Sequence, residues 1–179
     1  LPVDCGWMYR DSVEIDELKD PMQFKHLKLM PGSGGAGKFR GAPGCDISFG
    51  PKERNMTVIY PCDGQHFAPK GVCGGADGQL ASGWHVSANG LETKLPNVTT
   101  VELKKGELVR GQDSSGGGYG RPLDRDPRLV LHDVLESWET MDRARDIYGV
   151  IFTGTVADET LAIDAVATAR RRGELGAQA

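Results

Sequence analysis

The sequence predicts an α+β protein, in which a mainly antiparallel β domain of sandwich or barrel type is followed by a small helical subdomain. Glycine supplies 25 of the 179 residues, well above the usual share of about 7%, and without a repeat it indicates many turns. Short alternating apolar runs come first, and helical periodicity appears only near the C-terminus. We therefore expect an extended lead-in, the β domain, a glycine-rich pivot and the helical subdomain, at residues 1–21, 22–113, 114–125 and 126–179.

The composition is that of a soluble globular protein, with 39% hydrophobic and 26% charged residues. A net charge of -4 gives no electrostatic basis for binding nucleic acid. No apolar run approaches the roughly 20 residues of a membrane span, and no signal-peptide pattern opens the sequence. We therefore expect a cytoplasmic protein that binds neither nucleic acid nor a membrane. Because methionine is absent from the start, we expect a processed or truncated chain, or a piece of a longer protein.

The lead-in carries apolar side chains that have no sustained period. Trp7, Met8 and Tyr9 precede an acidic run, and Pro21 prevents a helix from crossing its end. We expect an extended segment that needs another surface to pack against.

Seven alternating runs are typical of short strands, at residues 22–30, 45–49, 56–60, 84–88, 91–95, 98–103 and 108–110. Asn89-Gly90 between two of these runs is a strong hairpin signal. The turn at 50–55 predicts a second antiparallel pair, between 45–49 and 56–60.

A glycine-rich loop follows the first strand. Gly32 to Lys38 satisfies the phosphate-loop pattern up to its last position, where Phe39 replaces the Ser or Thr that would hold magnesium. Glycines and a proline directly after this segment exclude the helix that such a loop must open, so we reject a mononucleotide site. Two alternatives remain: a structural turn, which we favour, or a backbone surface lining an active site. In the second alternative the contacts to substrate or to an anion come from Gly34, Gly35, Lys38 and Arg40.

The loop at 61–69 contains Asp63 and His66, which are the candidates for an acid/base pair. The alternative is that local hydrogen bonds satisfy His66. Cys62, His66 and Cys73 match no zinc spacing and lack a fourth ligand, so we predict no metal site. All four cysteines lack a disulfide or zinc pattern, and we expect free thiols at Cys5, Cys45, Cys62 and Cys73.

The pivot contains Gly116, Gly117 and Gly118, followed by Tyr119. Glycines without Cβ atoms let the backbone approach a ligand or another strand closely. The alternatives are a flexible hinge, which we favour, and a backbone cradle for an anionic or planar ligand. Tyr119 counts against a simple linker, which would be rich in Ser, Gly and Pro.

Three helices are predicted after the pivot. Asp126 is an N-cap followed by proline at the first helical position, and the first helix has an apolar face of Leu131, Val134, Leu135 and Trp138. The second runs from about Thr140 to Gly149, with Met141, Ala144 and Ile147 facing inward. A capping box at 155–158 predicts the third, which the arginines at 170–172 end.

The glycine segments at 31–41, 71–75 and 116–120, together with the tail from Asp126 to Val150, resemble the C-terminal part of the hydantoinase B family. This family covers the B-type subunits of N-methylhydantoinase, ATP-dependent 5-oxoprolinase, and acetone and acetophenone carboxylases. The resemblance extends over residues 9–172 in order.

The resemblance implies one portion of a multi-subunit enzyme. ATP and magnesium are expected on an A-type partner, where phosphorylation of a carbonyl oxygen activates an amide or ketone. The B-type subunit then completes ring hydrolysis or carboxylation of a small-molecule substrate. Family members are several times longer, and a divalent metal belongs to the N-terminal part that this sequence lacks. We therefore expect no cofactor in this chain and no ATPase activity from it alone.

The resemblance also implies partners: the remainder of a B-type subunit and an A-type subunit. We expect an apolar surface that these partners cover, with Asp63, His66 and the glycine turns towards it. The sequence departs from the family at Ala42, where oxoprolinases are expected to have a second glycine after Arg40-Gly41. The substrate, whether hydantoin, 5-oxoproline or a ketone, is therefore left open, and so is a non-catalytic assembly role.

Overall fold

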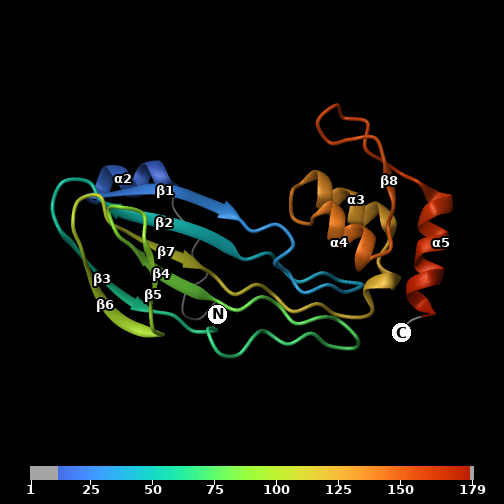
Figure 1. Ribbon diagram of the computed structural model, residues 1–179, viewed down its shortest axis with the longest axis horizontal. Helices are drawn as coiled ribbons and strands as arrows, with labels where there is room; N and C mark the ends of the chain where they lie inside the picture. Colours follow the sequence, from blue (N-terminus) through green and yellow to red (C-terminus); the bar gives the residue numbers. More distant parts are fainter. Residues whose placement is uncertain (1–11, 178–179) are drawn as a thin grey trace. The chain divides into compact units, whose positions relative to one another are not determined.

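The computed structural model describes residues 12–177. The strands in Figure 1 are β1 (Met22–Leu29), β2 (Cys45–Pro51), β3 (Met56–Pro61), β4 (Ser82–Val86), β5 (Glu92–Lys94), β6 (Val98–Leu103), β7 (Leu108–Gln112), β8 (Phe152–Thr153) and β9 (Ala162–Ile163). The helices are α2 (Val13–Lys19), the short 3-10 helix η1 (Pro122–Asp124), α3 (Pro127–Leu135), α4 (Met141–Asp146) and α5 (Ala165–Gly176). Strands followed by helices confirm the predicted α+β class. Cys5, Trp7, Met8 and Tyr9 lie outside the described residues.

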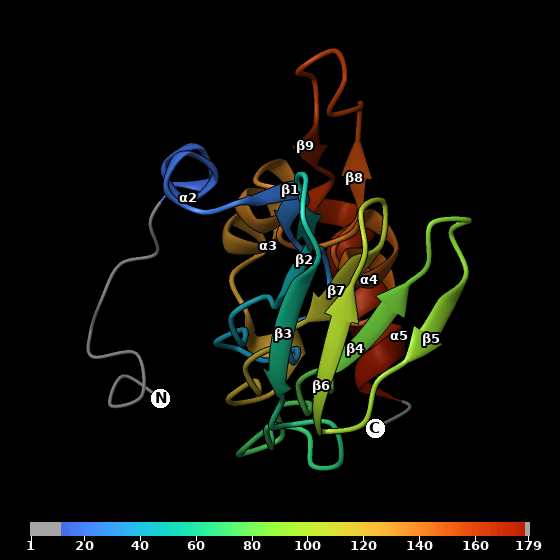
Figure 2. The ribbon, with the colours of Figure 1, turned by 90° about the vertical axis from the view of Figure 1, so that its left-hand side faces the viewer.

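The strands form one five-stranded sheet, in the order β1-β2-β7-β4-β5, and two ribbons, β3–β6 and β8–β9. Both ribbons are antiparallel, as is the β4–β5 pair, and Figure 2 shows β3 and β6 side by side. The β4–β5 pair confirms the hairpin predicted from Asn89-Gly90. Gly90 has a φ of +86°, a conformation that glycine adopts without a steric penalty.

The described chain folds into two compact units, each assembled from separate stretches of sequence. The first contains residues 12–27, 47–61 and 83–110, and the second contains residues 28–46, 62–82 and 111–177. The predicted domain boundaries at 21, 113 and 125 stay predictions. None of the helices within residues 12–177 is long and apolar enough to cross a membrane.

The first unit has a small core under the β3–β6 ribbon. Leu103 and Val109 are buried there with Leu95, and the inward residues of the ribbon, Met56, Val58, Tyr60 and Val101, pack against them. Side chains alternate along β3, so Ile59 faces outward and is 75% exposed.

The second unit has a core formed by its helices, the β8–β9 ribbon and one residue of the glycine loop. The buried members are Ala36, Val130, Val134, Ala144, Tyr148, Val150 and Leu161. Ala36 joins the glycine loop to this core, so the loop is fixed by apolar packing as well as by hydrogen bonds. This unit carries every loop residue that the sequence analysis selected as a candidate site.

The predicted pairing of β2 with β3 is wrong. In the structure β2 lies between β1 and β7, whereas β3 pairs with β6, with Val58 opposite Val101. The turn between β2 and β3 therefore links two different sheets. A turn signal constrains the chain locally, but it does not determine which strand becomes the partner.

The lead-in is not extended throughout. Residues 13–19 form α2, because Ser12 acts as N-cap by accepting a hydrogen bond from the Ile15 amide. Glu14 and Asp16 in the first turn favour the helix through its dipole. These polar starting signals lie ahead of Pro21, which is compatible with a helix that ends before it.

The first predicted helix is confirmed at its start, where Asp126 caps α3 and accepts a hydrogen bond from the Arg128 amide at 2.9 Å. Its predicted face is wrong at Leu135, which is 47% exposed, whereas Val130 is buried. The helix ends at Leu135, so Trp138 lies beyond it and continues no helical face. Helical spacing therefore misplaced Leu135 within the helix, and it failed at Trp138 because the helix ends before that residue.

The second predicted helix is shorter than expected, because α4 occupies Met141–Asp146 with Thr140 as its N-cap. Ala144 is buried as predicted, but Met141 is 42% exposed. The chain leaves the helix before Gly149, which has a φ of +63°.

The predicted capping box at 155–158 starts no helix. Thr155 donates its hydroxyl to Asp158 at 2.6 Å, and the Thr160 hydroxyl donates to the same carboxylate, so the motif closes the β8–β9 turn. These hydrogen bonds lower the pKa of Asp158 to about 2. The third helix instead begins after Asp164, and the arginines at 170–172 lie within α5 rather than at its end.

Candidate functional site

The glycine-rich segments of the second unit lie against one another. The Gly35 amide donates to the Gly116 carbonyl at 2.9 Å, and the Gly116 amide donates to the Ala42 carbonyl at 2.8 Å. A Cβ atom on Gly35 would lie 2.6 Å from the Gly118 nitrogen, closer than real Cβ contacts allow. The predicted close approach of backbone therefore occurs, and protein backbone occupies the space beside these glycines.

This glycine cluster positions Lys38 and Arg40 differently. Lys38 is exposed, and its ammonium lies 5.8 Å from the centre of the Phe39 ring. The Arg40 side chain turns inward and is only 11% exposed. Its Nη1 donates to the Gly41 carbonyl at 2.7 Å. Of the two predicted anion contacts, only Arg40 belongs to a defined site.

Arg40 is part of a buried charge cluster around Asp133. Its Nη2 lies 3.3 Å from Asp133 Oδ1, while Arg125 donates through Nε and Nη2 to Asp133 Oδ2 at 3.1 and 2.8 Å. Arg125 also donates to the Lys38 carbonyl at 3.0 Å. Two guanidinium groups therefore share one carboxylate, so the cluster has an excess of one positive charge among the described residues.

An open pocket of about 480 Å³ lies beside this cluster, lined by Leu29, Arg40, Ala42, Pro43 and Trp138. The Arg40 guanidinium carbon lies 5.3 Å from the centre of the Trp138 ring, within range of a cation–π interaction. We call this the Arg40–Trp138 pocket. It combines apolar walls with one cationic group. Ala42, the position where the sequence departs from the oxoprolinase pattern, forms part of its wall.

A second pocket, of about 320 Å³, lies on the turn at 32–34 and the loop at 77–79. Arg143 lines it, and its charge is balanced by the buried carboxylate of Glu139, whose Oε1 accepts from Arg143 Nε at 2.7 Å. Arg143 also donates to the Gly34 carbonyl at 3.1 Å. This pocket is therefore polar but close to neutral.

Tyr148 lies in the core beneath these groups and is fully buried. Burial, followed by the negative charge of Glu139, raises the pKa of its hydroxyl to about 12. The hydroxyl has no hydrogen-bond partner within the described part of the chain.

Asp63 and His66 do not form a pair. Both are exposed, and no hydrogen bond joins them within the described residues. Nearby on the chain, Cys73 is exposed with a φ of 53°, and contact with its thiol raises the pKa of Tyr119. Cys45, Cys62 and Cys73 are free thiols. Catalytic roles for Asp63 and His66 stay predictions.

Residues 12–177 contain no group of three His, Cys, Asp or Glu side chains placed to hold a metal ion. The Cys62, His66 and Cys73 set is therefore not assembled in this part of the chain.

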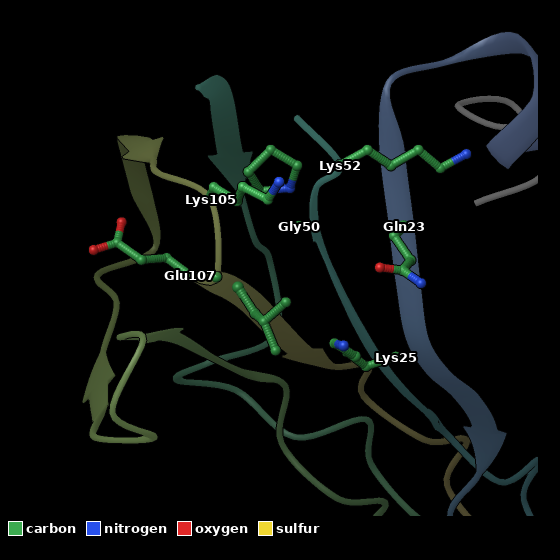
Figure 3. A pocket seen from close by; sticks show the side chains of 9 residues that line it. Gln23, Lys25, Gly50, Lys52, Lys105 and Glu107 are labelled. Carbon is green, nitrogen blue, oxygen red and sulfur yellow. The ribbon is translucent and has the colours of Figure 1, made fainter. Parts of the chain in front are cut away.

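The first unit has a pocket of its own, of about 230 Å³, lined by Gln23, Lys25, Gly50, Pro51, Lys52, Lys105, Gly106, Glu107 and Leu108 (Figure 3). Figure 3 shows Lys52 and Glu107 pointing away from the space between them. Lys52 donates to the Glu17 carbonyl, and Lys105 pairs with Glu53 at 3.1 Å. The charged groups of this pocket do not converge on a common point, so we place the candidate site in the second unit.

Sequence reasoning identified Arg40 and the glycines, but it missed Trp138, Asp133 and Arg125. Asp133 lies on the buried side of α3 beside Val130 and Val134. A charged residue at an apolar position of a predicted helix indicates that it is buried together with a partner of opposite charge. For Asp133, Arg40 or Arg125 could have been proposed as that partner.

Comparison with known proteins identifies the family of this chain. Residues 3–122 match the family Hydantoinase B/oxoprolinase. The chain belongs to this family. The beta subunit of caprolactamase from Pseudomonas jessenii is 32% identical over 158 residues, which are 86% of this chain and 27% of that protein. The B-type subunit of a putative D-/L-hydantoinase from Pseudomonas sp. (strain NS671) is 32% identical over an alignment of 153 residues, which covers 80% of this chain and 24% of that protein.

The fold of this family member also occurs in a solved structure. The nucleotide-free structure of an acetone carboxylase matches 94% of this chain and 26% of its own with a TM-score of 0.72 and 23% identity. That likeness concerns the fold alone. This member of the Hydantoinase B/oxoprolinase family spans about a quarter of the length of each of these three proteins.

Proposed function

We propose that the chain is the C-terminal portion of the B-type subunit of an ATP-dependent cyclic-amide hydrolase. The observation that carries this proposal is the 32% identity to the caprolactamase beta subunit, which covers 86% of the chain. A second relative of equal identity has a hydantoinase name. Both names refer to enzymes that open a cyclic amide, so we extend that substrate class to this protein.

In this proposal the second unit contributes part of the active site and of the subunit interface. The glycine cluster fixes Gly34, Gly35, Arg40 and Gly116 in a rigid backbone. The Arg40–Trp138 pocket offers a cationic group beside apolar walls, which suits a small, partly apolar ring. Catalytic groups not assembled in the described residues belong to the partners.

The proposed partners are the remainder of a B-type subunit and an A-type subunit that binds ATP and magnesium. A divalent metal, where the reaction uses one, belongs to the remainder of the B-type subunit. We propose a cytoplasmic location, where ATP is available.

An alternative is the corresponding part of an ATP-dependent ketone carboxylase of the acetone or acetophenone type, which the family resemblance also covers. A non-catalytic assembly subunit is the other alternative, since Asp63 and His66 stand apart among the described residues.

The test is to purify the tagged chain from the cells that produce it and to identify the bound polypeptides by mass spectrometry. The complex is then assayed with and without ATP on caprolactam, hydantoin and 5-oxoproline, and on acetone with bicarbonate. ATP-dependent ring opening supports the proposal, and consumption of acetone alone supports the carboxylase. A complex that turns over none of these substrates contradicts both enzymatic functions.

A further inference from the structure

The Arg40–Trp138 pocket adjoins a positive charge that the carboxylates of residues 12–177 do not neutralise. Asp133 is the carboxylate that pairs with Arg40, and it is shared with Arg125. The neighbouring Glu139–Arg143 pair compensates itself. A buried charge imbalance of this kind favours an anion at the accessible side of the cluster.

Arg40 also keeps donors for a ligand. A guanidinium has five N–H groups, of which one on Nη1 is used by Gly41 and one on Nη2 faces Asp133. Nε is buried without a partner in the described residues. Each Nη atom therefore retains one N–H, and the side chain lines the pocket.

The remaining walls are apolar. Leu29, Ala42 and Pro43 supply aliphatic contacts, and the Trp138 ring stacks with Arg40. This lining matches the hydrocarbon part of a small molecule better than a polar phosphate ester. A phosphate group carries about -1.5 to -2 charges and three strong acceptor oxygens, which a single uncompensated charge does not match.

We propose that the Arg40–Trp138 pocket binds the carboxylate of a small aliphatic organic acid. The carboxylate accepts from the free N–H groups of Arg40, and the aliphatic part lies against Trp138 and Leu29.

In the reaction, the pocket then binds the product. This role rests on the proposed function. Hydrolysis of a lactam such as caprolactam breaks the C–N bond, adds the oxygen of water to the carbonyl carbon and places both protons of water on the nitrogen. It leaves a carboxylate and an ammonium group on one chain. The pocket distinguishes this product from a substrate without an acid group, because then only the product has a carboxylate.

Binding is tested on the full 179-residue chain with three probes of equal length: hexanoate, hexanamide and hexylamine. The readout is the indole N–H resonance of Trp138 in a ¹H–¹⁵N spectrum, assigned by comparison with a Trp138→Phe variant. We expect hexanoate to shift this resonance saturably, hexanamide to bind at least tenfold more weakly, and hexylamine to cause no shift. The resonance of Trp84 serves as an internal reference.

Two variants separate a site from a general surface effect. Arg40→Gln is expected to weaken hexanoate binding at least tenfold, whereas Arg145→Gln, at an exposed arginine that pairs with Asp142 and Asp146, leaves it unchanged. Should Arg40→Gln fail to fold, Arg40→Lys keeps the charge but loses the planar fork, and we expect threefold or greater weakening. Equal affinity for hexanoate and hexanamide, no shift up to 50-fold excess, or greater loss in the Arg145 variant would overturn the proposal.

The two proposals fail separately. If the purified complex opens no cyclic amide but hexanoate still binds at Arg40, the carboxylate site stands and only its role as a product site is lost. If ring opening occurs and hexanoate does not bind, the function stands and the pocket assignment is wrong.

Discussion

Gly41 packs so closely against Gly116 that a Cβ atom on Gly41 would overlap the Gly116 carbonyl oxygen. Gly41→Ala is therefore expected to destabilise the protein by more than about 4 kcal/mol, because two backbone segments must separate. Gly173→Ala is the matched control, since nothing lies within 4 Å of that position in α5. It should stabilise the helix by about 0.5–1 kcal/mol. Guanidinium unfolding of both variants measures the difference, and equal stabilities would contradict the tight packing.

Asp133 pairs with two buried arginines, so we expect its charge to contribute more to the stability of the fold than the charge of a surface carboxylate. Its side chain is 3% exposed and contacts both Arg40 and Arg125. Asp133→Asn leaves two buried cations without a counter-ion, and we expect a loss of about 3–5 kcal/mol. Asp142, which pairs with Arg145 at the surface, provides the control: Asp142→Asn should be nearly neutral. The midpoints of thermal unfolding of the two variants test this prediction. Similar midpoints would show that the buried ion pairs of Asp133 contribute little to stability.

Tyr148 provides a pH-dependent test. Its folded-state pKa of about 12 exceeds the unfolded value of about 10, so between these pH values the folded state binds more protons than the unfolded state. The free energy of unfolding contributed by this group is constant below pH 10 and falls by up to about 1.4 kcal/mol per pH unit above it. Tyr148→Phe removes this dependence. It also removes a hydroxyl without a partner in the described residues, so near pH 7 it should be neutral or stabilising.

The measurement is the difference in unfolding free energy between Tyr148→Phe and the wild-type chain at pH 8, 9, 10 and 11. Taking the difference cancels the titration of other groups that both proteins share. A difference that stays constant from pH 8 to 11 would show that Tyr148 ionises as readily in the folded state as in the unfolded one.

The sequence predicted strand positions well, because alternation of apolar residues reflects a local property of each strand. It failed on the pairing of β2 and β3, because a sheet is completed by distant segments. Val58 and Val101 are 43 positions apart, yet they lie opposite each other. They pair because both pack against the buried Leu103 and Val109. This contact is not encoded in the local pattern of either strand.

The candidate site could be predicted only in part, because the sequence shows residue types and local spacing but not which distant segments meet. Glycines and Arg40 stood out as residue types, and the structure shows why so many glycines are needed where Gly35 and Gly116 meet. Trp138 was assigned to a helical face, because its spacing from Leu131 continues the period of α3. The chain turns before it, with Ser137 at a φ of 58°, and the side chain lines the pocket instead.

The helix α5 begins at Asp164 and not at the predicted capping box of residues 155–158. Asp164 accepts a hydrogen bond from the Ala167 amide at 2.9 Å and is the N-cap, whereas Thr155 serves the β8–β9 turn. Asp164→Ala should therefore cost about 0.5–2 kcal/mol of stability, while Asp164→Asn, which retains an acceptor, should cost much less. Circular dichroism at 222 nm together with urea unfolding gives the readout. Thr155→Ala should leave the helical signal unchanged. If instead Thr155→Ala lowers that signal and Asp164→Ala does not, the helix begins at the capping box, and the assignment of α5 is wrong.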